Sequence, residues 1–246
     1  MILPTEKVKA SRRNPKRLLI YGGPKSGKTT LASMIPDNLI IDLENGTDCI
    51  DAMKVNANSM AELQEIYGAL YEAKEANGGK PPYKRITLDN LTVLEDWCVT
   101  SACDSYRETT IGKNFEGSNI LELPMGGGYY WLRKEVLNWA IYYLEQFCEE
   151  LILIGHTKEK SILKNGKEIT VEDLQLAGKL ASIVCGAMDA TGQLYRDTQG
   201  RAIISFKHFE NSAGARTKHL RGQDIILSDP NVDGDNFKWD AIYIDG

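Results

Sequence analysis

The chain has 246 residues and a mass of 27.4 kDa, which fits one large domain or two small ones. Its 42% hydrophobic and 26% charged residues are typical of a folded globular protein and exclude a disordered or fibrous chain. No apolar run approaches the ~18 residues that span a bilayer, and the basic start lacks the apolar stretch of a secretory signal. We therefore expect a cytoplasmic protein without membrane association. Five cysteines without a C-x-x-C pair favour reduced thiols over disulfides or a zinc site.

The net charge of −5 conceals segments of opposite sign. Residues 1–28 carry eight Lys and Arg against one Glu, and residues 196–221 carry six against two acids. Residues 222–246 carry six Asp against one Lys. Each basic cluster is either a solvated surface or a site for a polyanion. The acidic total therefore does not exclude a nucleic acid as partner.

Strand and helix signals alternate through the first 105 residues. Short apolar runs ended by Gly, Pro or Asp predict strands, and apolar positions at helical spacing predict helices. A capping box, Ser59-Met60-Ala61-Glu62, opens one of these helices. The expected strands are Leu18–Tyr21, Leu39–Asp42 and Arg85–Leu88, and the expected helices are Thr29–Ile35, about 59–77 and Leu91–Ser105.

The second half begins with residues 107–128, a stretch rich in Gly, Thr, Asn and Ser that predicts a long, functional or disordered loop. An apolar stripe predicts a helix over Tyr129–Cys148, and a continuous apolar run predicts a buried parallel strand at Leu151–Gly155. A hairpin with Asn165-Gly166 at its tip, a helix over Asp173–Cys185 and a hairpin of Ala187–Arg196 with Ala202–Lys207 are expected to follow. This order predicts a wound α/β fold with a mainly parallel sheet flanked by helices, and an antiparallel hairpin at one edge.

One motif carries chemistry directly. The run Gly22-Gly23-Pro24-Lys25-Ser26-Gly27-Lys28-Thr29 fits G-x-x-x-x-G-K-[ST], with a strand before it and a helix after it. Backbone N–H groups of such a loop and the helix N-terminus bind phosphate oxygens. We expect Lys28 to contact the β- and γ-phosphates of ATP and Thr29 to ligate Mg²⁺, with Thr30 in the same binding set. A chance match in a Gly-rich turn is disfavoured by the flanking strand and helix.

Polar residues follow three other apolar strands. Asp89 could hold the magnesium shell, or it could cap the next helix. Asp42 and Glu44 are both candidates for orienting or deprotonating an attacking water molecule. His156 could sense the γ-phosphate, although a lone His is more often structural. Because the carboxyl ends of parallel strands meet at one edge of a sheet, these residues are expected near the phosphate loop.

In this order, the loop and the three strand ends resemble the RecA-like ATPases over about residues 18–210. The resemblance implies that Glu44, not Asp42, activates the water, that Asp89 holds Mg²⁺, and that His156 replaces the usual Gln sensor. The chain looks most like the minimal RecA-core ATPases of bacteriophages, including single-strand annealing proteins. The division that follows is a basic N-terminal arm at 1–17, a RecA-like ATPase domain at 18–227 and an acidic C-terminal tail at 228–246.

The resemblance further implies two DNA-binding loops and an ATP site shared between subunits of a ring or filament. The first loop is the Gly-rich stretch at 107–128. The second is Thr157–Glu172, whose candidate DNA-binding residues are Lys158, Lys160, Lys164 and Lys167. Aromatic residues in or near the loops could stack on bases or could pack in the core; they are Tyr106, Phe115, Tyr129 and Tyr130. Lys207 is the best match for a basic residue that reaches the ATP of the neighbouring subunit, and Arg216 or Lys218 are weaker matches.

These features favour a Mg²⁺-dependent ATPase that binds single-stranded DNA in recombination, annealing or repair and is stimulated by that DNA. If the protein is encoded by a phage, it would act in the bacterial host cytoplasm, with a single-strand-binding protein as a further candidate partner. Two alternatives stay open. One is an ATP-driven regulatory or assembly switch that acts on a protein, favoured by the overall acidity and the acidic tail. The other is a P-loop kinase for a small molecule, with the 196–221 cluster as its lid.

Overall fold

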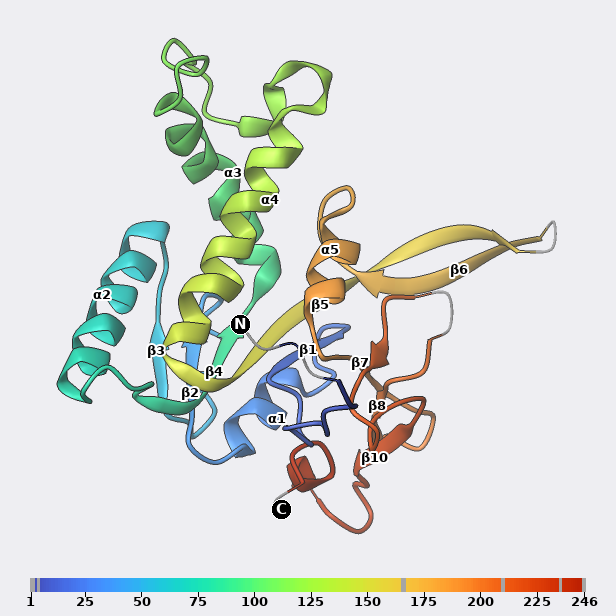
Figure 1. Cartoon of the computed structure of the whole chain (residues 1–246). Helices are drawn as coiled ribbons and strands as arrows, with labels where there is room; N and C mark the ends of the chain where they lie inside the picture. Colours follow the sequence, from blue (N-terminus) through green and yellow to red (C-terminus); the bar gives the residue numbers. More distant parts are fainter. Residues whose placement is uncertain (1–2, 4, 165–166, 209–210, 235, 245–246) are drawn as a thin grey trace.

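The structure, a computed structural model, describes residues 3, 5–164, 167–208, 211–234 and 236–244 and contains one large sheet (Figure 1). Its strands follow the order β10-β8-β7-β1-β5-β4-β2-β3, with β6 paired to β5 and β9 to β7. The strands are β1 (Arg17–Gly22), β2 (Asn38–Asp42), β3 (Lys54–Asn56), β4 (Tyr83–Asp89), β5 (Cys148–Lys164), β6 (Lys167–Leu174), β7 (Ala190–Arg196), β8 (Ala202–Ser205), β9 (Gly214–Ala215) and β10 (Asp224–Ser228). The α-helices are α1 (Lys28–Met34), α2 (Met60–Ala76), α3 (Leu91–Arg107), α4 (Gly128–Leu137) and α5 (Leu180–Ala187).

The centre of the sheet is parallel. Strand β1 lies between β5 and β7 and is parallel to both, and the parallel arrangement continues through β4, β2 and β3. Strands β8 and β10 extend the other edge in antiparallel pairing. The expected fold class is therefore confirmed. The register places Gly22 beside His156 and Asp42 beside Asp89, so the carboxyl edge of the sheet gathers the chemically informative residues.

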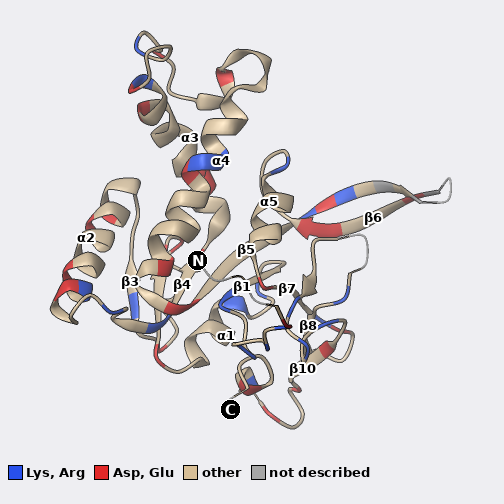
Figure 2. Ribbon diagram, viewed as in Figure 1, with Lys and Arg blue, Asp and Glu red and all other residues tan. Residues whose placement is uncertain are grey.

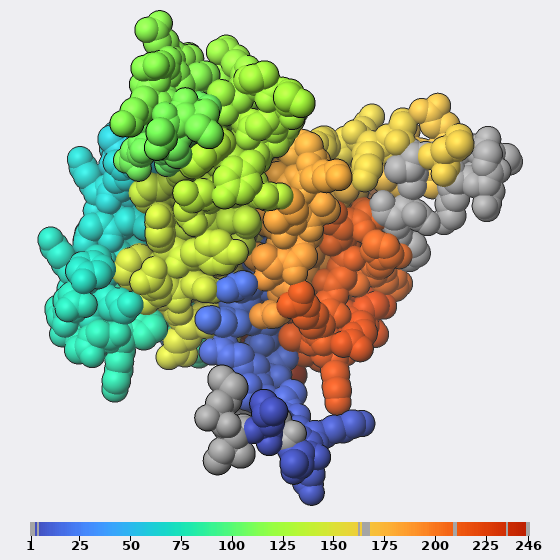
Figure 3. Space-filling view, turned by 45° about the horizontal axis from the view of Figure 1, so that its top comes forward, coloured from blue at the N-terminus to red at the C-terminus, as the bar shows by residue number. Residues whose placement is uncertain are grey.

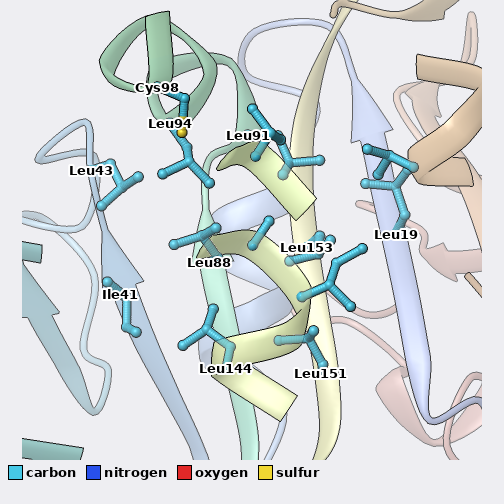
Figure 4. Close-up of a cluster of buried hydrophobic side chains, with 14 of the residues drawn as sticks. Leu19, Ile41, Leu43, Leu88, Leu91, Leu94, Cys98, Leu144, Leu151 and Leu153 are labelled. Carbon is cyan, nitrogen blue, oxygen red and sulfur yellow. The ribbon is translucent and has the colours of Figure 1, made fainter. Parts of the chain in front are cut away.

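Both faces of the sheet are buried. On β1, Leu19 faces the larger core, which is completed by α2, α3, α4 and α5, while Leu18 and Ile20 face a smaller core on the opposite side. Figure 4 shows part of the larger core, where side chains of the central strands pack beneath residues of α3 and the segment after α4. Because side chains alternate between two covered faces, these strands are continuous apolar runs in the sequence.

The C-terminal segment contributes to the smaller core. Phe237, Ile242 and Tyr243 are buried there, next to Leu31 of α1. The guanidinium group of Arg85 lies 4.6 Å from the centre of the Tyr243 ring. A short 3₁₀ turn, η5 (Trp239–Ala241), carries the segment past this contact. The Asp-rich composition of residues 228–246 thus conceals apolar side chains that pack in the smaller core beside α1.

Two parts of the chain project from the sheet (Figures 1 and 3). One is the helical protrusion, formed by the distal halves of α3 and α4 with their connection, which contains the 3₁₀ turns η1 (Ile120–Glu122) and η2 (Pro124–Gly126). The other is the arm, the antiparallel ribbon of β6 and the second half of β5. The Asn165-Gly166 tip expected for this hairpin lies outside the described residues. No described helix combines the length and the apolar character needed to cross a membrane.

Two expected helices differ in the structure. The one expected over Tyr129–Cys148 begins as α4, then becomes a π-helical turn, η3 (Asn138–Tyr143), and a 3₁₀ turn, η4 (Leu144–Gln146). The helix expected from Asp173 is wrong at its start, because β6 continues to Leu174 and α5 begins only at Leu180. Pairing of Asp173 and Leu174 with β5 outweighs their local helical pattern.

Candidate functional site: a phosphate loop and strand-end carboxylates

The phosphate loop joins β1 to α1 at the carboxyl edge of the sheet. Lys25 and Gly27 adopt positive φ values of 62° and 104°, and Gly27 precedes the first residue of α1. A Cβ atom on Gly22 would lie 2.2 Å from the carbonyl oxygen of Leu194, so only glycine fits where β1 ends. A Cβ atom on Gly27 would lie 2.7 Å from the ring of Phe237, which supports the loop from below. The loop is thus held in a tight curve around the start of α1.

Lys28 is buried and folds back over the loop. Its Nζ atom donates hydrogen bonds of 2.9 Å to the carbonyl oxygens of Gly22 and Gly23. Burial lowers the pKa of Lys28, while the nearby carboxylates of Asp89 and Glu44 act in the opposite direction. The hydroxyl of Ser26 is buried and has no hydrogen-bond partner among the described residues. An unpaired hydroxyl and a cation inside a curved loop fit a phosphate group.

In the sheet, β5 lies between β1 and β4. The side chain of Thr29, which follows β1, and that of Asp89, at the end of β4, contact each other across the end of β5. The Thr29 hydroxyl donates a 2.6 Å hydrogen bond to Asp89 Oδ2. Burial raises the pKa of Asp89 to about 6; the hydrogen bond from Thr29 opposes that rise, and the charges of Asp42 and Glu44 add to it. Burial and the negative neighbours destabilise the ionised form of this carboxylate, so a cation nearby would stabilise it. Together with the Thr29 hydroxyl, the carboxylate therefore fits a Mg²⁺ ion that binds with the phosphates.

Asp42 and Glu44 have different environments. Asp42 is fully buried, and its carboxylate accepts hydrogen bonds from the Glu44 backbone and from both the backbone and the hydroxyl of Thr47. Although burial alone would raise the pKa of Asp42, these hydrogen bonds hold it below its ordinary value. Asp42 therefore shapes the turn after β2. The Glu44 side chain is 37% exposed, and its carboxylate faces the site.

His156 lies between Glu44 and Asn90. Its Nε2 atom is 3.0 Å from Glu44 Oε1 and 3.0 Å from Asn90 Nδ2, and its buried Nδ1 atom has no partner in the described part of the chain. Asn90 caps α3, because its Oδ1 atom accepts hydrogen bonds from the backbone N–H groups of Thr92 and Val93. Asn90 is not among the site residues expected from the sequence. Its position directly after Asp89 was the available signal.

The basic residues suggested for a shared ATP site occupy two different places. Lys207 follows β8, and its ammonium group pairs with Asp224 of β10. Arg216 pairs with Asp189 at the amino end of β7. Lys218 lines a cavity near that same amino edge. Lys207 therefore follows an antiparallel edge strand and is held by that strand's neighbour, whereas Arg216 and Lys218 lie near the amino end of β7, at the edge opposite the phosphate loop.

The arm carries both signs of charge (Figure 2). Lys158 donates a 2.5 Å hydrogen bond to the carbonyl oxygen of Leu176, and Lys160 pairs with Asp173 at 3.7 Å. Lys164 and Lys167 are paired in register at the end of the ribbon, and their side chains lie outside the described part. The first two lysines therefore fasten the base of the arm.

The aromatic residues of the helical protrusion divide into two groups. Tyr106 packs its ring 5.5 Å from both Phe115 and Trp131, centre to centre. Tyr129 and Tyr130 are about half exposed. The first group therefore stabilises the protrusion, and the second group presents ring surface to solvent.

Comparison with known proteins places the chain in a family. A family described as "AAA domain" matches residues 14–217. No curated protein matches the sequence significantly. Among solved structures, the crystal structure of the RadB recombinase aligns over 78% of this chain and 80% of its own, with 14% identity and a TM-score of 0.41. The family match spans most of the chain and includes the phosphate loop, Asp89 and His156, and it shows that this chain belongs to the AAA-domain family.

Proposed function

We propose that the protein is an ATPase of the RecA type that binds single-stranded DNA and acts in recombination, annealing or repair. One observation carries the proposal. His156, which contacts Glu44, and Asn90, which contacts His156, stand at the roots of the two projections. His156 lies on β5, which continues directly into the arm, and Asn90 caps α3, which leads into the helical protrusion. In this proposal, a change in nucleotide state reaches both projections through these contacts.

The residues of the site have separate roles in this proposal. Lys28 and the loop N–H groups bind the phosphates, and Thr29 with Asp89 hold Mg²⁺. Glu44 accepts the proton of the attacking water molecule, and His156 positions the Glu44 carboxylate. ATP with its Mg²⁺ ion supplies the phosphoanhydride bond that is cleaved. Lys207 is the candidate for contact with ATP of a neighbouring subunit in a ring or filament, which requires release of its pairing with Asp224.

The projections supply the contacts to DNA. Tyr129 and Tyr130 present ring surface on which bases can stack. Lys164 and Lys167 lie at the far end of the arm and supply charge for phosphates. Such contacts are independent of base sequence, so we expect an affinity that falls steeply with salt. A phage origin and a single-strand-binding protein as partner belong to the same proposal.

The charges of the arm favour one of the alternative functions. Lys158 and Lys160 are held by Leu176 and Asp173, and acidic residues alternate with basic ones along the arm. A ribbon of mixed charge is better suited to a protein surface than to DNA. The second candidate function is therefore an ATP-driven switch that acts on a protein partner.

The rate of ATP hydrolysis with and without single-stranded DNA, at low and moderate salt, distinguishes the two. The DNA-directed function predicts a several-fold stimulation that fades with salt. Hydrolysis that is intact but indifferent to DNA supports the protein-directed switch instead. The Lys28→Ala variant is the control, because loss of the phosphate-binding cation should abolish nucleotide-dependent activity in either case.

A further inference from the structure

A basic cavity lies at the edge of the sheet opposite the phosphate loop. It has a volume of about 580 Å³ and is formed between the N-terminal segment before β1 and the loop after β9. Figure 3 shows these segments, blue and orange, lying side by side. The cavity therefore joins parts of the two basic clusters, 1–28 and 196–221, that are far apart in the sequence. Its charged lining residues are Arg12, Arg13, Asp189, Arg216, Lys218 and Arg221.

The walls of this basic cavity are fixed by backbone contacts. The Asn14 side chain exchanges two 3.0 Å hydrogen bonds with the backbone of Ile244, which fastens the N-terminal segment to the C-terminal one. His219 Nε2 donates to the carbonyl oxygen of Ile242 at 2.9 Å. Arg221 Nη2 donates to the carbonyl oxygen of Arg216 at 2.7 Å. These hydrogen bonds therefore hold in place the segments that carry the cations.

The charge of the basic cavity is poorly compensated. Asp189 is the one acidic residue among its lining residues, and its Oδ2 atom already accepts hydrogen bonds from the backbone N–H groups of Lys16 and Arg17. Its other oxygen lies 3.7 Å from Arg216 Nη1. In the described part of the chain, Arg13 and Lys218 have no ion-pair partner. Several exposed positive charges therefore line the same cavity with one acidic residue among them, an arrangement that an anion would stabilise.

The kind of anion follows from the lining. Guanidinium groups bind phosphate oxygens through their N–H donors, and four guanidinium groups line the cavity. Those of Arg12, Arg216 and Arg221 already donate to backbone carbonyl oxygens, but each guanidinium carries five N–H donors and keeps others for a phosphate. No Phe, Tyr or Trp lines the cavity, so it offers no surface on which bases stack. The volume exceeds what one phosphate fills, and the exposed Lys7 and Lys9 continue the positive charge along the N-terminal segment. These features fit consecutive phosphates of a nucleic-acid strand.

We propose that the basic cavity binds the phosphate backbone of single-stranded nucleic acid, as a contact separate from the two projections. The inference rests on the proposed DNA-directed function and assigns it a second surface. Because the cavity is at the amino edge of β1 and β7, away from the ATP site, its contribution to binding does not depend on the bound nucleotide.

The test uses charge reversal on each wall. Binding of a labelled oligo(dT) to the full chain is measured at several salt concentrations, with and without ATP. The Arg12→Glu/Arg13→Glu variant and the Lys218→Glu variant should each bind about tenfold or more weakly, with a shallower salt dependence of about 0.7 per lost phosphate contact. The reduction should be equal with and without ATP. DNA-free ATP hydrolysis and the unfolding temperature of Arg12→Glu/Arg13→Glu should match those of the unmodified protein.

The control is Lys80→Glu/Lys84→Glu, which makes the same charge change at exposed positions before and on β4 and should bind within twofold of the unmodified protein. Unchanged binding in both cavity variants overturns the inference and leaves the projections as the DNA site. A loss confined to Arg12→Glu/Arg13→Glu also overturns it, because only a free basic arm would then be involved. Competition by polyglutamate as strong as that by oligo(dT) would instead identify a site for acidic protein segments. If the unmodified protein binds no DNA at all, the proposed function itself fails.

Discussion

The Nε2 atom of His156 lies 3.0 Å from Glu44 Oε1 and equally close to Asn90 Nδ2. The amide orientation of Asn90 is fixed, because its Oδ1 atom is used to cap α3, so Nδ2 can only donate. An ionised carboxylate can only accept. One ring nitrogen cannot accept from Asn90 and donate to Glu44 at once, so the position of the imidazole proton selects which neighbour His156 binds. A shift of the imidazole proton would therefore exchange the contact of His156 with Glu44, the proposed catalytic base, for its contact with Asn90, or the reverse. Both His156 and Asn90 lie at the roots of the projections.

The Glu44→Gln variant should retain ATP binding and lose turnover by about 10²–10⁴-fold, because the amide cannot accept a proton from water. Asp42→Asn makes a useful comparison. It removes charge from a carboxylate that only forms a turn, so it should lower stability more than the rate per folded molecule. Steady-state hydrolysis and equilibrium nucleotide binding separate the two effects. Normal turnover by Glu44→Gln would show that Glu44 is not the catalytic base.

His156→Gln should preserve DNA-stimulated hydrolysis within a few-fold, because a glutamine amide can still donate to Glu44. His156→Ala should retain ATP binding but lose most of the stimulation, since it removes the contact between Glu44 and β5 that His156 makes. The readout is the ratio of hydrolysis rates with and without DNA. Equal ratios in the alanine variant and the unmodified protein would assign His156 a purely structural role.

Asp89 gives a pH dependence with a definite sign. Its pKa is about 6 in the folded chain, whereas an unfolded aspartate titrates near ~3.9. Between these values the folded chain binds more protons than the unfolded one, so the free energy of unfolding falls as pH rises, and the cost persists above pH 6. Asp89→Asn should therefore stabilise the nucleotide-free protein at pH 7–8 by about 1–3 kcal/mol and have little effect below pH 4.

The same Asp89→Asn variant should lose Mg²⁺-dependent nucleotide binding, which links the stability cost to function. Urea unfolding at pH 4, 6 and 8 measures the first effect, and nucleotide titration with Mg²⁺ or EDTA measures the second. Asp51→Asn, at an exposed position outside the site, is the control. A stability difference that does not change with pH would contradict the buried, metal-free carboxylate.

Charge reversal at Lys164 and Lys167 should weaken DNA binding while leaving ATP binding intact. Reversal of Lys158 and Lys160 should behave differently, because their partners Leu176 and Asp173 fasten the base of the arm; it should lower the unfolding temperature as well. DNA affinity and thermal unfolding, measured on both double variants, separate the two pairs. Equal DNA affinity after reversal of Lys164 and Lys167 would exclude the arm as a DNA contact.

Local patterns were sufficient for the centre of the fold. A buried strand, a Gly-rich turn and a helix specify the phosphate loop, and polar residues after other buried strands pointed to Asp89 and His156. These residues lie at one edge because a parallel sheet brings all carboxyl strand ends together; their roles stay predictions. The role of Asn90 could not be predicted, because its contact with His156 depends on β4 and β5 being neighbours. The short edge strand β3 was missed because its Lys-Val-Asn sequence has no alternating pattern.

Features that depend on contacts between distant segments could not be predicted from local sequence patterns either. The helix expected from Asp173 is wrong at its start, because Asp173 and Leu174 pair with β5 as the end of β6. The basic cavity depends on β1 and β7 being adjacent, since that adjacency brings residues 12–13 beside residues 216–221. The burial of Phe237 could not be predicted either, because this residue lies within the most acidic part of the chain.

The ring of Phe237 beside Gly27 has a consequence for changes made far from the motif. The residues of the phosphate loop lie about 200 positions before this ring in the chain. A substitution that removes the ring leaves every residue of the motif in place and still removes a surface on which the loop packs. An intact motif in the sequence is therefore no guarantee of an intact loop, and the segment around Phe237 should be as sensitive to substitution as the loop itself.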